Sequence, residues 1–159
     1  MLRSLSIAAA LVLTFSAPVR AGIVDSPIPA PFTKHVYSVP GVINTGALAT
    51  FFSCTNVDSA SATVGVEVFG PAGGASINNA ATTAISVAPG ATVIFGTSNA
   101  LGISVDANLN VGFVSKGSAR ILATSTKLLC TAFLADPGSA PPISMVSLTI
   151  VGKTKQKGD

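Results

Sequence analysis

Two cysteines are the residues in this chain whose chemistry is easiest to interpret. Cys54 lies in the stretch F-F-S-C-T-N, and Cys130 lies far downstream in L-L-C-T-A-F-L. The C-x-x-C spacing that lowers a thiol pKa in redox pairs is absent, so a catalytic dithiol is not indicated. Two cysteines in an exported chain predict one disulfide, with a pair of free thiols as the alternative. We therefore expect Cys54 and Cys130 to be bonded to each other.

The chain has one histidine, His35, close to its one tyrosine, Tyr37. A general base also needs a nucleophile and an orienting partner, and sequence spacing shows neither. The lipase motif G-x-S-x-G, the phosphate-binding motif G-x-x-x-x-G-K-[ST] and the zinc motif H-E-x-x-H are all absent. We therefore predict no catalytic residue and no cofactor. An enzyme built on His35 stays open as an alternative, and it requires a Ser or Asp side chain beside the imidazole.

One segment has the spacing of a calcium loop. Asp106 to Asn110 reads D-x-N-x-N, which offers oxygen ligands. The sixth position is Val111 instead of glycine, and the twelfth is Gly117 instead of a bidentate glutamate, so the sharp turn and the strongest ligand are both missing. We predict a polar turn and no metal site. The remaining acidic residues are scattered, and they provide no carboxylate pair for glycoside hydrolysis.

The charge content of the chain limits the classes of molecule that it can bind. Charged residues make up 9% of the sequence, against about 25% in typical soluble domains. Nucleic-acid binding needs a concentrated basic face, and the mature chain has a net charge of only about +1, from seven basic and six acidic residues. The surface must consist largely of Ser, Thr, Asn, Ala and Gly. We expect such a surface to pack against another protein outside the cell.

The first 21 residues have the three parts of a secretory signal peptide. Arg3 supplies the positive charge, Leu5 to Phe15 form an apolar run, and Val19-Arg20-Ala21 provide a cleavage site. A membrane anchor is the alternative, but the apolar run is shorter than the roughly 20 residues that cross a bilayer. We expect cleavage after Ala21, secretion or a periplasmic location, and no transmembrane segment in the mature chain.

The rest of the chain divides into a leader over 22–33, a β domain over 34–152 and a polar tail over 153–159. The leader contains D-S-P-I-P-A-P-F, whose prolines favour an extended, helix-free conformation. The three lysines of the tail could touch an anionic surface, and a solvated terminus is the simpler interpretation.

The elements of the β domain follow from period-two patterns between Gly and Pro turns. Ala62 to Phe69 alternates valines with Thr63, Gly65 and Glu67, as in a half-buried antiparallel strand. No stretch of the domain has helical spacing. We predict an all-β fold, an antiparallel two-sheet β-sandwich of immunoglobulin-like architecture, in which the Cys54–Cys130 disulfide joins the two sheets.

Two surface features are also expected. Lys34 to Val39 alternates His35, Tyr37 and Val39 and is followed by Pro40-Gly41, which predicts an edge strand that ends there. Arg120 is expected to be a surface charge that protects a sheet edge. Binding would then use the edge strand or the loop over Gly70 to Asn79, by strand addition or by loop contacts.

Four stretches together resemble a group of small exported bacterial proteins of unassigned function. They are F-F-S-C-T-N, V-G-V-E-V-F-G-P-A-G-G, V-A-P-G-A-T-V-I-F and G-S-A-R-I-L-A-T-S-T-K-L-L-C-T-A-F-L-A-D, and they span roughly Phe51 to Asp136. The resemblance implies a β-sandwich and carries no catalytic residues over. We expect a non-enzymatic structural or protein-interaction module that contacts another envelope or extracellular protein, or its own copies. A periplasmic protein that binds a small ligand or a glycan is the alternative.

Overall fold

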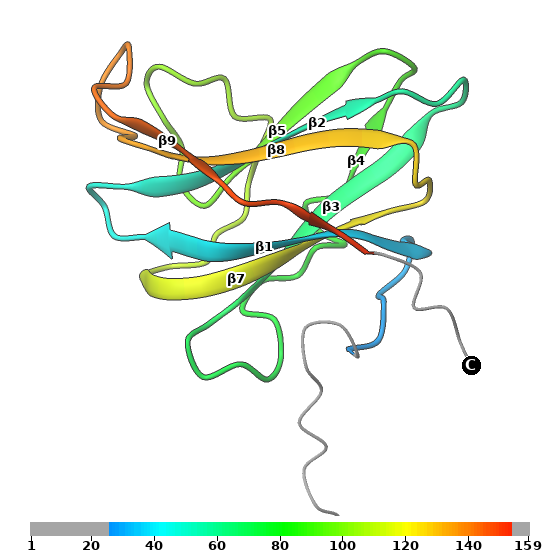
Figure 1. The fold of residues 1–159 in the computed structure, drawn as a ribbon, viewed down its shortest axis with the longest axis horizontal. Helices are drawn as coiled ribbons and strands as arrows, with labels where there is room; N and C mark the ends of the chain where they lie inside the picture. Colours follow the sequence, from blue (N-terminus) through cyan, green and yellow to red (C-terminus); the bar gives the residue numbers. More distant parts are fainter. Residues whose placement is uncertain (1–25, 154–159) are drawn as a thin grey trace, which may run out of the picture.

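A computed structural model describes residues 26–153 as ten β-strands without a helix (Figure 1). The predicted signal peptide over 1–21, the leader residues 22–25 and the tail residues 154–159 lie outside the described part. The all-β prediction is confirmed for the described residues. The strands are β1 (Lys34–Asn44), β2 (Ala49–Asn56), β3 (Ala62–Phe69), β4 (Ile85–Val87), β5 (Thr92–Gly96), β6 (Ala107–Asn108), β7 (Val114–Ala123), β8 (Leu128–Ala135), β9 (Met145–Leu148) and β10 (Val151–Gly152).

The strands make one mixed sheet that is nearly closed into a barrel-like shape (Figure 1). The main path runs β4-β3-β7-β1-β2-β5-β6, while β8 pairs with β2 and β9, and β10 pairs with β1. All of these pairings are antiparallel except the short parallel pairing of β5 with β6. The segment from β9 to β10 crosses from β8 to β1 and so narrows the last opening of the sheet (Figure 1).

β1 is an interior strand, so the prediction of an edge strand over Lys34 to Val39 is wrong. It pairs with β7 along its length and with β10 at Tyr37 on its other side. Pro40-Gly41 does not end it either, because the register against β7 shifts there and the strand continues to Asn44. Gly41 has a φ of 80°, a left-handed conformation that costs glycine little and that fits this irregularity.

β3 is buried on both faces, although its alternation predicts one exposed face. Its valines belong to the main core, and the opposite face carries Gly65 and Glu67. This second face is covered because Phe32 of the leader is buried there with Ala80 and Leu122. Glycine is required at position 65, since a Cβ atom there would lie 2.3 Å from Cζ of Phe32. The leader is therefore part of the packed fold.

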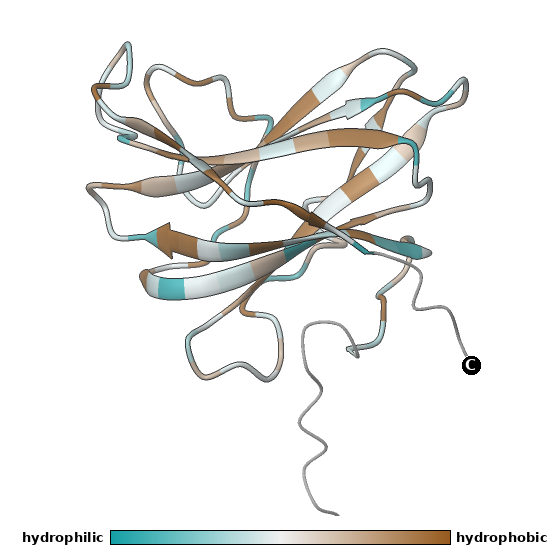
Figure 2. Ribbon diagram, in the orientation of Figure 1, coloured by the Kyte–Doolittle hydropathy of each residue, from teal (hydrophilic) through white to brown (hydrophobic). Residues whose placement is uncertain are grey.

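The main core fills the interior of the barrel-like sheet, where hydrophobic residues alternate along the strands (Figure 2). Among its largest fully buried side chains are Phe52, Phe95, Leu109 and Ile121. A second cluster lies on the outer side of β2 and β8, where the rings of Phe51 and Phe133 stack with centroids 5.5 Å apart. Loop residues between β5 and β6 cover these rings.

Cys54 and Cys130 face each other on the neighbouring strands β2 and β8. Their sulfur atoms are 2.13 Å apart, a disulfide distance, and their Cα atoms are 4.1 Å apart. A Cα separation this short is typical of a non-hydrogen-bonded antiparallel pair, in which Cα atoms lie about 4.5 Å apart. The pair joins two adjacent strands, so the prediction that it connects two packed sheets is wrong.

Candidate functional site

Glu67 on β3 and Arg120 on β7 stand opposite each other in the sheet and form a buried ion pair. Nε of Arg120 donates to Oε2 of Glu67 at 2.5 Å, and the arginine side chain is 1% exposed. The prediction that Arg120 is a surface charge at a sheet edge is wrong, because β7 lies between β1 and β3. Burial of the two charges is tolerable because each compensates the other.

The guanidinium of Arg120 also holds the leader against the sheet. Nη1 donates to the carbonyl oxygen of Ser26, and Nη2 donates to that of Pro27, both at 2.7 Å. The guanidinium carbon lies 5.6 Å from the ring centroid of Phe69, within the range of a cation–π contact. The planar fork of arginine can serve these partners at once, which the ammonium of a lysine could not do with the same geometry.

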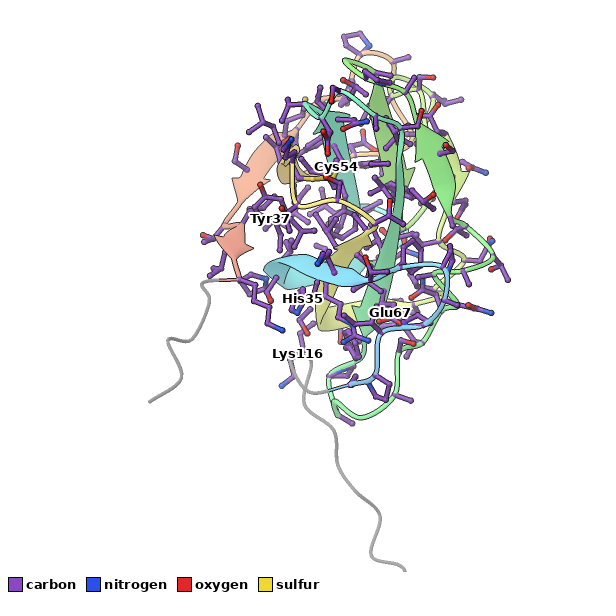
Figure 3. The ribbon with its side chains drawn as sticks, turned by 90° about the vertical axis from the view of Figure 1, so that its right-hand side faces the viewer. His35, Tyr37, Cys54, Glu67 and Lys116 are labelled. Carbon is purple, nitrogen blue, oxygen red and sulfur yellow. A yellow bond between two sulfur atoms is a disulfide. The ribbon has the colours of Figure 1, made fainter. Side chains whose placement is uncertain are left out.

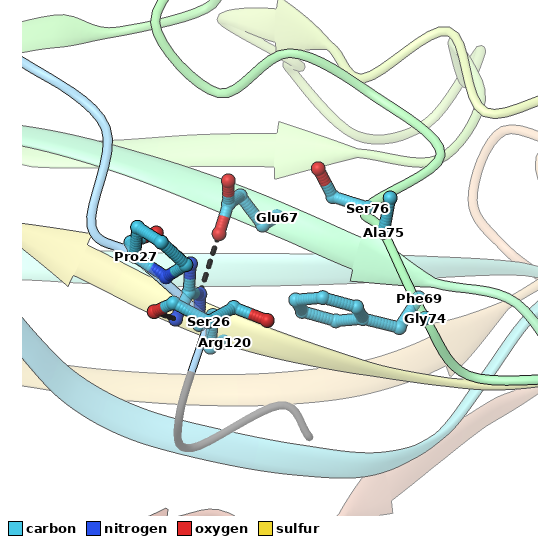
Figure 4. A pocket seen from close by; sticks show the side chains of 8 residues that line it. All are labelled: Ser26, Pro27, Glu67, Phe69, Gly74, Ala75, Ser76 and Arg120. Atoms are coloured by element: carbon cyan, nitrogen blue, oxygen red, sulfur yellow. Dashed lines mark hydrogen bonds and ion pairs between the residues drawn. The ribbon is translucent and has the colours of Figure 1, made fainter. Parts of the chain in front are cut away.

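A cavity of about 300 Å³ opens next to this ion pair (Figure 4). It is lined by Ser26, Pro27, Glu67, Phe69, Gly74, Ala75, Ser76 and Arg120. One carboxylate oxygen of Glu67 is turned to Arg120 and the other points away from it (Figure 4). The cavity has the volume of a small ligand pocket at the lower end of the usual range. Its lining combines a carboxylate, a guanidinium, the hydroxyl groups of two serines and an aromatic ring.

His35 is buried on β1, and its environment decides which ring nitrogen carries the proton (Figure 3). Nε2 lies 3.0 Å from the carbonyl oxygen of Tyr37 and 3.0 Å from Oγ of Ser38. A carbonyl oxygen only accepts, so the neutral ring must be protonated at Nε2, which then cannot act as a base toward Ser38. Nδ1 is buried without a hydrogen-bond partner. The structure thus brings His35 to a serine, but in a geometry that does not activate the hydroxyl group.

Burial lowers the pKa of His35 below its ordinary value of 6.5. The hydrogen bond to the backbone at Tyr37 opposes this shift, and the positive charges of Lys153 and Arg120 add to it. The imidazole is therefore held in its neutral form in the folded protein near neutral pH.

Asp106 caps the outer edge of β5. Its Oδ2 accepts a hydrogen bond from the N–H of Ile94 at 2.7 Å, and its own N–H donates to the carbonyl oxygen of Ile94 at 2.8 Å. Oδ1 of Asn108 accepts from the N–H of Asn110, which closes a polar turn. Residues 26–153 contain no group of three or more His, Cys, Asp or Glu side chains that could hold a metal ion.

The free edge of β3 beyond β4 is also capped. Asn78 donates from Nδ2 to the carbonyl oxygen of Val66 and accepts at Oδ1 from the N–H of Val68, each at 2.8 Å. Ile77 adds a backbone hydrogen bond to Val68. The carboxamide of Asn78 takes the place of a neighbouring strand, so the loop over Gly70 to Asn79 closes this edge instead of offering it for strand addition.

Four large apolar side chains are exposed on the loops and strand ends at one end of the sheet. They are Leu101, Phe113, Ile143 and Met145, exposed by 75%, 76%, 83% and 60%. Hydrogen bonds join the loops that carry them: the N–H of Leu101 donates to Pro137, and Nδ2 of Asn44 donates to both Thr97 and Gly112. We call these four residues the apolar end, which is the end of the sheet with the β1–β2 turn (Figure 1).

The opposite end of the sheet carries a polar network. The hydroxyl group of Ser125 donates to Asp58 at 2.8 Å, and the ammonium of Lys127 lies 3.1 Å from the same carboxylate. These hydrogen bonds lower the pKa of Asp58 to about 2. This end also exposes the apolar side chains of Val57 and Leu129, by 50% and 64%, beside its charged groups.

No protein-family model, curated protein or solved structure matches this chain. Between residues 26 and 153 the structure has no helix that is long and apolar enough to cross a membrane. Function must therefore be argued from the geometry of this chain alone.

Sequence reasoning missed the ion pair and the apolar end. Glu67 and Arg120 lie far apart in the sequence and meet only through the pairing of β3 with β7. The signal that could have found them is a charged residue inside an otherwise apolar strand, since such a charge is usually compensated by a partner. Of the chemically active candidates, His35 and Asp106 are each used within the fold.

Proposed function

We propose that this protein is a non-enzymatic exported module with a structural or protein-interaction role, and that it contacts its partner through the apolar end. The observation that carries this proposal is the exposure of Leu101, Phe113, Ile143 and Met145 together at one end of the sheet. Soluble domains seldom expose grouped large apolar side chains, and such groups are typical of interaction surfaces.

Export of the mature chain is part of the proposal. The cysteines Cys54 and Cys130 at disulfide distance favour an oxidising compartment. The signal-peptide pattern over 1–21 and the resemblance to small exported bacterial proteins point the same way. A secreted or periplasmic location follows, and another envelope or extracellular protein, or a second copy, is the expected partner.

A two-sheet sandwich of immunoglobulin-like architecture is the finer fold that we propose for the domain. One layer would contain β4, β3, β7, β1 and β10, and the other would contain β6, β5, β2, β8 and β9. This division is supported by the single paired position between β1 and β2, Asn44 with Ala49. A solved structure that had full β1–β2 pairing would contradict it.

Photocrosslinking tests the interaction role. A photoreactive amino acid at position 101, 113 or 143 of the full chain, expressed in its producing cells, is expected to crosslink one specific protein or a second copy. The same residue at exposed Leu129 is the matched control and should give no such product. The double variant Leu101→Ser with Ile143→Ser should remove the product formed from position 113. Equal crosslinking from Leu129 would refute an interaction localised at the apolar end.

Binding of a small ligand or glycan is a second candidate, and the cavity beside Glu67 favours it. Hydroxyl or amine donors of such a ligand would bond to the carboxylate oxygen that points away from Arg120. The test is a thermal-shift screen of small polyols and amines, repeated with Ala75→Phe, which fills the cavity, and with Ala72→Phe on the same loop as control. A ligand that stabilises the wild type and Ala72→Phe but not Ala75→Phe would support this candidate. Equal stabilisation of all three would exclude the cavity.

A further inference from the structure

The segment over 145–152, which contains β9 and β10, contributes little to the core for its length. Six of its eight residues are exposed, and only Leu148 and Ile150 pack against the main core. Its backbone pairs with β8 over four positions and then with β1 over two. Within residues 26–153 no strand follows β10, so release of the segment displaces no other described strand.

The segment nevertheless covers two sheet edges that have no other strand beside them. β8 pairs with β2 on its other side, and β1 pairs with β7 on its other side. A hydrogen bond from Oη of Tyr37 to the carbonyl oxygen of Leu128, 2.6 Å long, bridges the two strands at one end of this seam. If the segment left, both edges would present unpaired N–H and C=O groups, which strongly favour pairing with another strand.

The seam differs from the edges of β3 and β5, which side chains close. Asn78 closes the edge of β3, and Asp106 closes the edge of β5. β9 carries no charge and no proline that would discourage pairing between molecules. The chain that fits the seam best is the 145–152 segment itself, since its register places Leu148 against Ala132 and Gly152 against Tyr37.

We propose that the 145–152 segment is exchangeable, and that the same segment of a second copy can occupy the seam between β8 and β1. The loop over 136–144 is the hinge, and it would run from one copy to the other in the exchanged dimer. Exchange reproduces every contact of the segment and therefore costs little beyond association. This inference rests on the proposed interaction role, which it deepens by naming a second copy as a partner.

Cysteine trapping can detect the exchanged contact directly. Because Cys54 and Cys130 form a non-hydrogen-bonded pair, the even-numbered residues of β8 turn their backbone groups toward β9, and the hydrogen bond from the N–H of Asp136 to Ser144 agrees with this. Ala135 and Met145 are then a non-hydrogen-bonded pair, whose short Cα separation suits a disulfide.

In the experiment, a full-length mature chain with Ala135→Cys is mixed at high concentration with one that carries Met145→Cys, and both are then oxidised. The expected result is a covalent dimer with a 135–145 disulfide between copies, assigned by peptide mapping, at least tenfold above the yield for Leu129→Cys mixed with Met145→Cys. Leu129 is exposed on β8 and reports random oxidation. A yield no higher than that control would overturn the proposal.

Light scattering of the mature wild-type chain over a range of concentrations gives a second readout. A folded species of twice the chain mass is expected at high concentration. A single-chain mass at every concentration would overturn the exchange. The trapping experiment reports the 135–145 register, in which Ala135 is fully buried, and photocrosslinking from positions 101 and 113 reports exposed side chains outside the segment. Exchange can therefore fail while photocrosslinking from these two positions succeeds, and the reverse.

Discussion

Replacing Arg120 with methionine is expected to lower the free energy of unfolding by about 3–5 kcal/mol, because Glu67 would keep a buried carboxylate without a cation beside it. Methionine retains much of the length of the side chain, so the loss is mainly one of charge and hydrogen bonds. The contacts to the carbonyl oxygens of Ser26 and Pro27 disappear as well. Such a loss is large compared with the 5–15 kcal/mol by which single domains are usually stable.

The double variant Arg120→Met with Glu67→Leu separates the ion pair from the other contacts of the arginine. Since both charges are gone, the double variant should be more stable than the sum of the single effects predicts. We expect a coupling energy of about 2–3 kcal/mol from the double-mutant cycle. The remaining destabilisation then measures the other contacts of Arg120, which include the hydrogen bonds to Ser26 and Pro27 and the contact with the Phe69 ring.

Urea unfolding followed by circular dichroism is the assay, with all variants compared at the same pH. Lys116→Met on the same strand is the matched control, because Lys116 is exposed and its loss should change stability by about 0.5 kcal/mol or less. If Arg120→Met costs less than about 1 kcal/mol, the two charges are hydrated in solution. The argument that a buried arginine connects the sheet to the leader would then be refuted.

Three further predictions concern stability. The double variant Cys54→Ala with Cys130→Ala should lower the melting temperature markedly, because a crosslink over 76 positions contributes about 4 kcal/mol in the chain-entropy model. An unchanged melting temperature would mean that the cysteines are not bonded. Gly65→Ala should cost about 1–3 kcal/mol because its Cβ would overlap the Phe32 ring, and Phe32→Leu in the same chain should recover part of the loss in urea unfolding. Finally, because the pKa of His35 is lowered in the folded protein, the unfolded chain binds this proton more readily. The free energy of unfolding should therefore fall as the pH decreases below 6.5. The variant His35→Gln should lack this pH dependence, and an equal dependence in both proteins would contradict the prediction.

Much of the fold could be predicted from local patterns. The alternation over Ala62 to Phe69 predicted β3 with the bounds that the structure has, because a residue spacing of two is a property of the strand itself. The same pattern misjudged the exposure of that strand. Gly65 and Glu67 look like a solvent face, yet the leader and the loop after β3 cover them. The segments that cover this face come from elsewhere in the chain, so the residue pattern of the strand cannot predict them.

The ion pair of Glu67 with Arg120 and the environment of His35 could not be predicted from the sequence for a related reason. Arg120 could be read as an edge charge because its flanking residues are ordinary strand formers, and its partner lies 53 positions away. The carbonyl oxygen of Tyr37 fixes the proton of His35 on Nε2, and the sequence gives no sign of this contact. Which nitrogen is protonated depends on atoms within 3 Å, and a sequence does not specify these distances.

The sequence by itself determined the all-β character of the domain and the low charge of its surface, and it predicted that the two cysteines form a disulfide. These properties follow from composition and from residue periodicity, which act within a few neighbouring residues. Only the tertiary structure decided that β1 is interior, that the cysteines lie on adjacent strands, and that Glu67 meets Arg120. Strand order depends on which strands that are distant in the sequence pair most favourably when the whole core is buried. These contacts are non-local, so no short stretch of the sequence determines them.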